Sequence, residues 1–289
     1  MKINSKQFLG IEKISYCDSK VVVVPFPYEG GLSYMKGTAK GPDAIIDASR
    51  YLELYDEILD REPYTVGICT VEPPKIASEA ELMIKTVYNV TSEILRDNKF
   101  IVSLGGDHSL SYGYCQALKE KYGQLSVIQL DAHADLRDSY EGSIYSHACV
   151  MSRIREITSN TLQIGIRSMS QNEAERIKKD NLQVCTMNDF RKGLFDIHSA
   201  IRNLPDPVFI TFDVDVFDWS VVRSTGTPEP GGLLWDESMH LLSKIFAMKQ
   251  IVGFDMVELS FNKNDRNSPF AVAKVIYKMI GFQYFINKY

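Results

Sequence analysis

Six short apolar runs rich in β-branched residues recur along the chain, and most of them lack a regular alternation of apolar and polar positions. This pattern is typical of strands that are buried on both faces of a sheet. The runs cover residues 21–26, 100–104, 125–130, 162–166, 208–212 and 251–259. We expect each of them to form a strand.

Stretches with a helical spacing of apolar residues lie between these strands. They cover residues 78–97, 109–122, 147–157, 237–248 and 268–280. Alternating strands and helices predict an α/β fold, in which right-handed crossovers build a mainly parallel sheet with helices on both faces. The segments 25–42 and 226–232 are rich in Gly and Pro, and we interpret them as functional loops rather than domain boundaries. We therefore expect residues 1–289 to form a single domain.

Composition narrows the classes of function. Of the 289 residues, 45% are hydrophobic and 24% charged, as in ordinary soluble globular proteins. A net charge of −5 argues against nucleic acid as a partner, because such a partner needs a basic face. The five cysteines show no close pairing, and no apolar run reaches the length of about 18 residues that a membrane span needs. We expect a cytoplasmic protein without membrane contact.

Polar side chains follow three of the expected strands, where parallel sheets bind their ligands. The segments are Gly105-Gly106-Asp107-His108, Asp131-Ala132-His133-Ala134-Asp135 and Asp213-Val214-Asp215. In an extended backbone, alternate side chains point to the same side, so we expect each Asp-containing segment to present its ligands together. The Gly-Gly pair is expected to permit a sharp turn before the histidine.

Together these segments offer two imidazoles and four carboxylates, from His108, Asp131, His133, Asp135, Asp213 and Asp215. Each motif alone has a simpler explanation, such as a buried hydrogen-bonded histidine or a solvated loop. Six ligands are too many for one catalytic zinc, but mixed nitrogen and oxygen donors suit two Mn²⁺ ions. Four carboxylates also balance the charge of two divalent ions. The combination predicts a binuclear manganese site.

These segments resemble the signature blocks of the ureohydrolases, a family that includes arginases, agmatinases and formimidoylglutamases. The third block continues into Gly226-Thr227-Pro228, and the resemblance covers nearly the whole chain. It implies a three-layer α/β/α sandwich, the six metal ligands named above, and a homo-oligomer that is a trimer or a hexamer. Residues 37–42, 49–56 and 225–232 resemble agmatinases most, which implies hydrolysis of agmatine to putrescine and urea in polyamine biosynthesis.

Four residues receive roles in this reaction. A water shared by two divalent ions loses its proton near neutral pH and can attack the guanidinium carbon, and Asp135 is placed to carry that proton. Glu258 ends an apolar run, where an unpaired charge is costly, and we expect it to hold the guanidinium through paired hydrogen bonds. By resemblance, His147 exchanges protons with solvent, unless it is merely a helix-start residue. Thr227 similarly matches a threonine near the guanidine, with a plain turn residue as the alternative.

The residues that would bind the tail of the substrate differ from those of arginases. Those enzymes use acidic residues after a Gly-x-Arg segment, where this chain has Ser168 and Ser170. Arginine is therefore disfavoured and agmatine comes first. Arg137 makes 4-guanidinobutyrate a competitor because it could pair with a carboxylate. We expect Arg137 rather to pair with Asp138 or Glu141 in its own loop.

Several other residues stay outside the predicted site. Trp219 and Arg223 replace residues that are usual in relatives, but the spacing is kept, so metal binding is expected to survive while selectivity is less certain. His198 and His240 match no signature block. Cys149 lies beside the segment of the proposed proton shuttle, and the sequence assigns it no role.

Two further classes of protein remain as alternatives. A two-metal phosphoesterase would need cationic groups to hold phosphate, whereas the conspicuous extra residue is the anionic Glu258. A non-catalytic oligomeric relative would be expected to lose ligands, and all six are present. Both alternatives predict that no guanidino compound releases urea.

Overall fold

The computed structural model describes residues 1–12, 14–30 and 34–288. In this part of the chain, eight strands form one sheet in the order β2-β1-β3-β8-β7-β4-β5-β6, and all neighbouring strands are parallel. The strands are β1 Val21–Phe26, β2 Ile68–Thr70, β3 Phe100–Gly105, β4 Ser126–Leu130, β5 Thr161–Ile166, β6 Gln183–Thr186, β7 Val208–Phe212 and β8 Ile251–Met256. The predicted parallel sheet is therefore confirmed.

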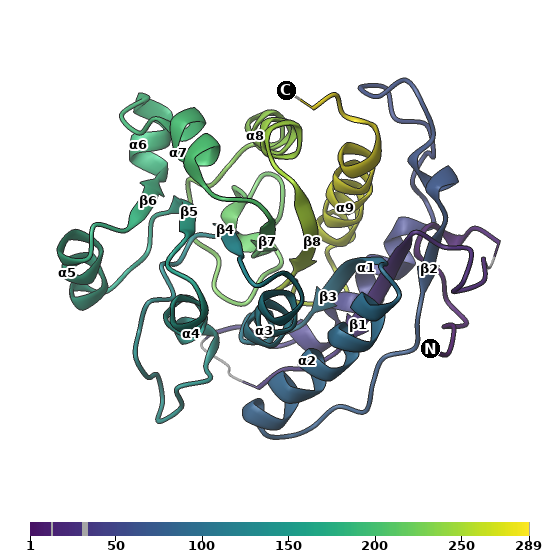
Figure 1. The fold of residues 1–289 in the computed structure, drawn as a ribbon, viewed down its shortest axis with the longest axis horizontal. Coiled ribbons are helices and arrows are strands. Elements are labelled where there is room, and N and C mark those ends of the chain that lie inside the picture. Colours follow the sequence, from purple (N-terminus) through teal and green to yellow (C-terminus); the bar gives the residue numbers. More distant parts are fainter. Residues whose placement is uncertain (13, 31–33, 289) are drawn as a thin grey trace.

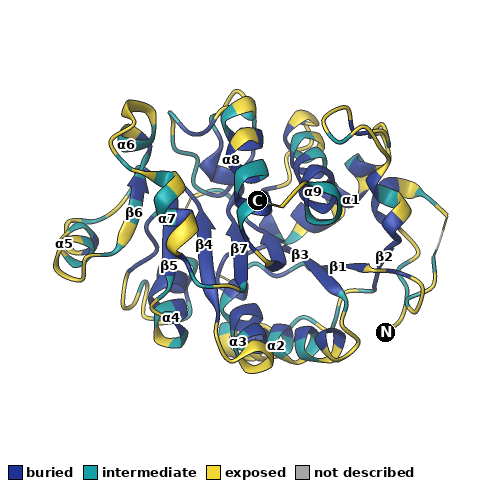
Figure 2. Cartoon of the chain, turned by 45° about the horizontal axis from the view of Figure 1, so that its top comes forward, coloured by how far each residue is buried: buried dark blue, intermediate teal, exposed yellow. Residues whose placement is uncertain are grey.

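Helices cover both faces of this sheet (Figures 1 and 2). Helices α2, α3 and α4 lie on one face, and α1, α7, α8 and α9 lie on the other. The helices are α1 Gly41–Ser49, α2 Ala80–Arg96, α3 Leu110–Tyr122, α4 Val150–Ile157, α5 Gln171–Lys179, α6 Met187–Lys192, α7 Ile197–Asn203, α8 Trp235–Met248 and α9 Asn267–Phe285. This arrangement is the expected three-layer α/β/α sandwich.

The sheet separates two hydrophobic cores. Along β1, Val21 and Val23 pack into the core beneath α1, α8 and α9, whereas Val22 and Val24 pack into the core beneath α2 and α3. Successive side chains of a strand point to opposite faces, so a strand covered on both sides is apolar at most positions of either parity. This requirement explains why the apolar runs in the sequence do not alternate.

The differences from the expected elements lie mostly at the edges. Strands β2 and β6 form the two edges of the sheet and were not predicted, since β2 has three residues and β6 is only partly buried. Helix α1 lies partly within the Gly- and Pro-rich segment, and α5 carries few apolar residues. Strand β8 ends at Met256 instead of residue 259, because Glu258 adopts a left-handed backbone with φ of 64°.

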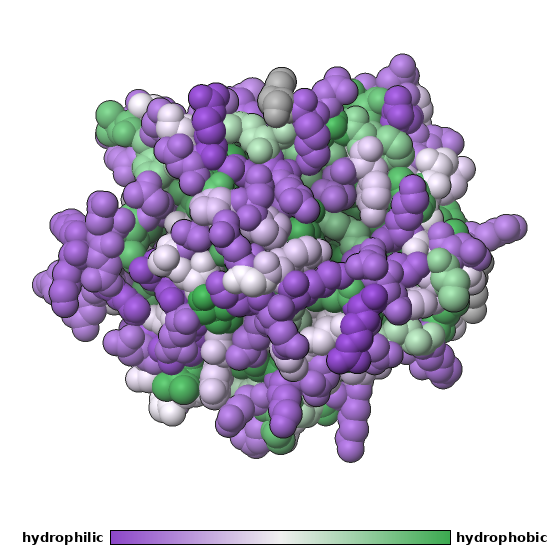
Figure 3. Space-filling view, in the orientation of Figure 1, coloured by the Kyte–Doolittle hydropathy of each residue, from purple (hydrophilic) through white to green (hydrophobic). Residues whose placement is uncertain are grey.

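The predicted motifs follow four strands that are neighbours in the middle of the sheet: β3, β8, β7 and β4. Their carboxyl ends therefore meet at one place, although the strands are far apart in the sequence. Hydrophilic side chains cover most of the face seen in Figure 3, where hydrophobic ones form small separate groups. Among the described residues, no helix has the length and apolar character that crossing a membrane requires.

Candidate functional site

The chain bends at Gly106 and Asp107, as expected, but the Gly-Gly pair at the end of β3 also serves close packing. Neither Gly105 nor Gly106 has a positive φ. A Cβ on Gly106 would lie 2.0 Å from the carbonyl oxygen of Tyr28, and one on Gly105 would lie 2.8 Å from a methyl group of Val257. The absence of side chains thus lets the loop that carries His108 pass against its neighbouring segments.

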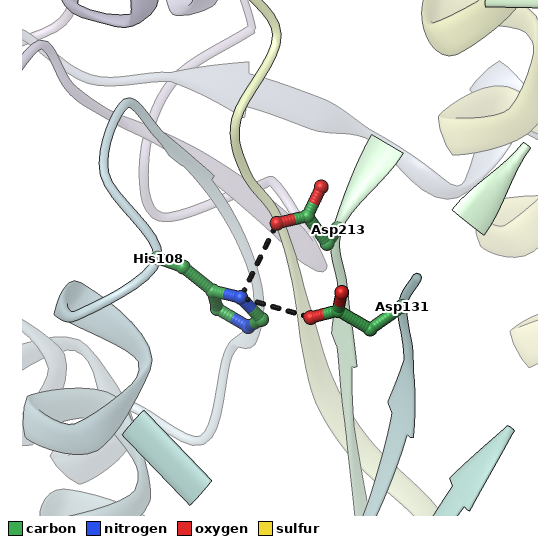
Figure 4. A group of neighbouring side chains, drawn as sticks. All are labelled: His108, Asp131 and Asp213. Atoms are coloured by element: carbon green, nitrogen blue, oxygen red, sulfur yellow. Dashed lines mark ion pairs between the residues drawn. The ribbon is translucent and has the colours of Figure 1, made fainter. Parts of the chain in front are cut away.

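The imidazole of His108 is buried among carboxylates (Figure 4). Its Nδ1 lies 3.2 Å from Oδ2 of Asp131, 3.2 Å from Oδ2 of Asp135 and 3.3 Å from Oδ2 of Asp213. Among the described residues, this nitrogen has no hydrogen-bond partner, while Nε2 lies 2.9 Å from the hydroxyl of Thr211. One nitrogen and three carboxylate oxygens that converge in this way fit a divalent cation.

A second group of ligand atoms shares Asp131 with the first. Nδ1 of His133 lies 2.9 Å from Oδ2 of Asp215 and 3.7 Å from Oδ1 of Asp131. The two sets that could hold an ion are His108, Asp131 and Asp213, and Asp131, His133 and Asp215. These two sets contain five of the six predicted ligands and are joined by one carboxylate, and the sixth, Asp135, lies 3.2 Å from Nδ1 of His108.

The backbone that presents these ligands is less regular than the expected extended segments. Asp135 is in the left-handed region with φ of 53°, which aspartate tolerates better than most residues. Asp213 precedes a short 3₁₀ turn, Val214–Val216, and its Oδ1 accepts a hydrogen bond of 2.9 Å from the backbone nitrogen of Asp215. Turns, rather than strand alternation, aim these carboxylates at the imidazoles.

The crowded acidic groups alter each other's protonation. Burial alone would lower the pKa of His108, but Asp131, Asp135 and Asp213 outweigh it and raise that pKa well above its ordinary value. Burial, followed by the charge of Asp131, raises the pKa of Asp135 to about 7. Such shifts show how strongly this cluster of carboxylates favours positive charge at its centre.

A cavity of about 260 Å³ opens above the two groups. The predicted residues that line it are His108, His133, Asp135, His147, Asp213, Thr227 and Glu258. Asp131 and Asp215 are buried beneath it. A larger groove, of about 610 Å³, lies on the surface formed by α2 and α3 and contains none of the predicted ligands. The chemistry thus concentrates in the smaller cavity.

Glu258 is held in a strained backbone conformation at this cavity. Its own nitrogen donates to the carbonyl oxygen of Gly106 over 2.8 Å, and its Oε1 accepts a hydrogen bond of 2.7 Å from the nitrogen of His108. Burial, followed by the charge of Asp107, raises the pKa of Glu258 well above its ordinary value. A non-glycine residue with positive φ and a buried charge is typical of functional positions.

His147 lies on a 3₁₀ turn, His147–Cys149, which leads into α4. Its ring packs edge-on against Tyr140, with 5.8 Å between the ring centroids, and burial lowers its pKa. Burial, followed by the charge of Asp135, raises the pKa of Cys149 to about 11. The histidine is therefore neutral near pH 7, and the neighbouring thiol is protonated and unreactive.

The expected partner of Arg137 is wrong. Its Nε lies 3.9 Å from Oε2 of Glu173, and its guanidinium lies over the ring of Tyr140. Asp138 pairs instead with Arg176, over 3.1 Å. Both Arg137 and Glu173 line the cavity. A carboxylate 36 positions away replaced the local one because α5 lies against this loop, which local sequence could not indicate.

In the sequence, Arg167 stood out only as part of the Gly-x-Arg segment. In the structure, it connects the loops around the site. Its Nη2 donates to the carbonyl oxygens of Asp215 over 2.6 Å and Glu229 over 2.8 Å, and its Nε donates to that of Pro230 over 3.1 Å. Two buried glutamines, Gln129 and Gln163, were also missed. Each was visible in the sequence as a glutamine inside an otherwise mainly apolar run.

The residues that we placed outside the site do lie elsewhere. His198, His240, Trp219 and Arg223 are exposed and are not among the residues that line the cavity. His198 contacts the guanidinium of Arg202. The departures at Trp219 and Arg223 therefore leave the cavity wall unchanged.

Comparison with known proteins agrees with this arrangement. Residues 19–281 match the arginase family. The chain is 40% identical to an N(1)-aminopropylagmatine ureohydrolase of Synechocystis sp., over 96% of this chain and 94% of that protein, and 32% identical to an agmatinase of Pyrococcus horikoshii, over 91% and 92%. The agmatine ureohydrolase structure of Thermoplasma volcanium superposes with a TM-score of 0.88 at 29% identity, covering 97% of this chain and 94% of that one. The chain therefore belongs to the arginase family of ureohydrolases.

Proposed function

We propose that this ureohydrolase is a binuclear manganese enzyme that releases urea from agmatine, leaving putrescine. The observation that carries the proposal is the pair of ligand groups that share Asp131 at the floor of a cavity. The half-buried carboxylate of Glu258 lines the same cavity. An acidic site of this kind suits a cationic guanidino substrate.

The six ligands divide between two ions. His108, Asp131, Asp135 and Asp213 would hold one ion, and Asp131, His133 and Asp215 the other. Mixed imidazole and carboxylate donors suit Mn²⁺, and four carboxylates of about −4 balance two ions of about +4. Two bound ions would supply a water activated for attack near neutral pH.

The remaining residues orient the substrate and move protons. Glu258 accepts two parallel N–H bonds from the guanidinium and turns its carbon toward the ligand groups. Asp135 receives the proton that the attacking water releases and passes it to the departing amine. His147, neutral and at the cavity wall, exchanges protons with solvent. Thr227 lines the cavity and contacts the guanidino end.

Among the described residues that line it, the tail end of the cavity lacks the free carboxylate that would recognise the α-ammonium group of arginine. Glu173 is its acidic residue, but it already accepts hydrogen bonds from Ser170, over 2.7 Å to both its nitrogen and its hydroxyl, and from the nitrogen of Leu136 over 2.9 Å. Arg137 lies beside it. An α-ammonium group would need a carboxylate that is not engaged in this way, which argues against arginine.

N(1)-Aminopropylagmatine is a second candidate substrate, because relatives at 40% and 35% identity carry that name. It has the guanidino end of agmatine and a longer amine tail. The ligand groups and Glu258 would therefore bind the guanidino end of the two substrates in the same way. Hydrolysis would yield a triamine and urea. The guanidino acid 4-guanidinobutyrate remains an alternative through Arg137.

The test is urea release by the Mn²⁺-loaded protein from agmatine, N(1)-aminopropylagmatine, 4-guanidinobutyrate, 3-guanidinopropionate and arginine at equal concentration. We expect the highest kcat/KM with one of the first two. A preference for a guanidino acid would overturn the substrate assignment. No urea from any compound, with two ions bound, would overturn the proposed activity and favour a non-catalytic relative.

A further inference from the structure

Two fully buried glutamines lie side by side on β4 and β5, toward the β6 edge of the sheet. Gln129 is on β4 and Gln163 on β5, and the two residues are paired in the register of these strands. Each interrupts a run of apolar side chains. A buried amide is costly unless it is hydrogen-bonded, so the partners of these two side chains indicate what they do.

Their hydrogen bonds lead in one direction, toward the ligands. Nε2 of Gln163 donates to Oε1 of Gln129 over 2.5 Å and to the carbonyl oxygen of Ala134 over 2.7 Å. Nε2 of Gln129 in turn donates to Oδ2 of Asp131 over 2.7 Å. Every group that faces the two Nε2 atoms is an acceptor, and this fixes the orientation of both amides.

The carboxylate of Asp131 is thereby held at both oxygens. Oδ1 accepts a hydrogen bond of 2.6 Å from the backbone nitrogen of His133, and Oδ2 accepts the one from Gln129. Oδ2 is also the oxygen that faces Nδ1 of His108. The backbone bond belongs to the loop itself, whereas the amide bond depends on one side chain that could be replaced.

We propose that Gln129 is a positioning residue that sets the affinity of the ion on the His108 side, with Gln163 holding its amide in place. The inference rests on the proposed binuclear site. Without the amide donor, the Asp131 carboxylate is held only at Oδ1 by the backbone nitrogen of His133 and can pivot about that atom, so that Oδ2 leaves the position from which it faces His108. The ion on the His133 side depends on Oδ1 and is affected less.

The arrangement at the far end of the pair supports a role beyond stability. Oε1 of Gln163 is buried and accepts no hydrogen bond from the described residues. Two apolar side chains would avoid this unsatisfied acceptor and would extend the cores that surround the strands. The amide pair is better explained by the donor that it delivers to a carboxylate.

The test is Mn²⁺ titration by calorimetry of the wild-type protein and of Gln129→Met, which keeps the side-chain length and removes the donor. We expect the wild type to bind two ions, and the variant to bind one ion with wild-type affinity and the other about 10- to 100-fold more weakly. Gln163→Met should weaken the same ion by a smaller factor. If Gln129→Met does not fold, the Gln163→Met variant alone tests the inference.

Gln7→Met is the matched control, because Gln7 is also a buried amide, bonded to the backbone of Thr70 and outside the cavity. We expect it to lower stability and leave both affinities unchanged. If Gln129→Met bound each of the two ions as tightly as the wild type does, this inference alone would be overturned. The same holds if Gln7→Met lost as much affinity for the ion on the His108 side as Gln129→Met does. A wild-type protein that binds no pair of ions would overturn the proposed function, and this inference with it.

Discussion

The carboxylate of Asp131 faces both imidazoles of the site, with Oδ2 3.2 Å from Nδ1 of His108 and Oδ1 3.7 Å from Nδ1 of His133. No other carboxylate belongs to both of the ligand groups found among the described residues. The two ions that we propose therefore depend on each other through one side chain.

Removal of the Asp131 side chain should consequently reduce metal binding more than removal of a ligand that belongs to only one group. We expect Asp131→Ala to retain neither ion after dialysis, and Asp215→Ala to retain the ion on the His108 side, as measured by atomic absorption. Asp213→Ala should lose metal as well as rate. A full complement of two ions in Asp213→Ala would remove this residue from the site, and two ions in Asp131→Ala would contradict the shared position.

The second prediction concerns His147. Burial lowers its pKa from the ordinary 6.5, so the neutral imidazole that can accept a proton is present above this lowered value and is lost as the pH falls through it. We expect an acid limb of kcat with a midpoint below 6.5, and a loss of about 10²- to 10⁴-fold in kcat for His147→Asn. As a control, His240→Asn at an exposed position should change neither the midpoint of the acid limb nor kcat. An unaltered pH profile in His147→Asn would exclude the proton-transfer role.

The third prediction concerns Arg137 and the substrate tail. Its positive charge lines the cavity and opposes an ammonium group, and two unit charges about 4 Å apart in water interact by about 1 kcal/mol. Arg137→Gln should raise kcat/KM about fivefold for agmatine and lower it by a similar factor for 4-guanidinobutyrate. Arg223→Gln removes an exposed charge away from the cavity and should leave the ratio unchanged. A shift of the same size in both variants would show a general effect of charge.

The fourth prediction concerns the guanidinium of Arg167, which joins the loop of Asp215 to that of Glu229 and Pro230. Lysine cannot reach these carbonyl oxygens at once, so Arg167→Lys should lower the free energy of unfolding by about 2–3 kcal/mol, measured with a chemical denaturant. Arg155→Lys is the control, because Arg155 makes one bond, to the hydroxyl of Thr161. Equal losses in the two variants would contradict a special role of Arg167.

The fifth prediction concerns Glu29, whose Oε2 accepts hydrogen bonds from Gly37, Thr38 and Ala39. Burial opposes its ionisation, but these bonds outweigh burial and lower its pKa below the ordinary 4.5. The stabilisation is therefore complete above pH 4.5 and is lost as the pH falls through the lower, folded-state pKa. Glu29→Gln should cost about 1 kcal/mol at pH 7 and progressively less in acid. A difference that grows on acidification would contradict this assignment.

The central strands could be predicted from the sequence because burial on both faces requires unbroken apolar runs. β1 and β7 have the bounds that the pattern indicates. Among the edge strands, β2 is buried but has only three residues, and β6 is only partly buried. Helix α5 is held by its capping box of Ser170 and Glu173 rather than by an apolar stripe. Local periodicity therefore contained little information about them.

For the site, the sequence supplied the ligand types but not the way in which they converge. The left-handed backbone of Asp135 and the turn after Asp213, which the Asp213 side chain stabilises locally, depart from the expected extended geometry. The pairing of Arg137 with Glu173 joins two segments that have no local relation. Gln129 was visible as an amide in a mainly apolar run, and its partner Asp131 is two positions away.

The position of β8 has a consequence for the order of events during synthesis. This strand, Ile251–Met256, lies between β3 and β7, so no strand on one side of β8 pairs with a strand on the other. His108 follows β3 on one side, and the four predicted ligand aspartates follow β7 and β4 on the other. Without β8, side-chain contacts such as that of His108 with Thr211 would be left to hold the two sides together. We therefore expect uptake of the proposed ion on the His108 side to follow the synthesis and insertion of β8.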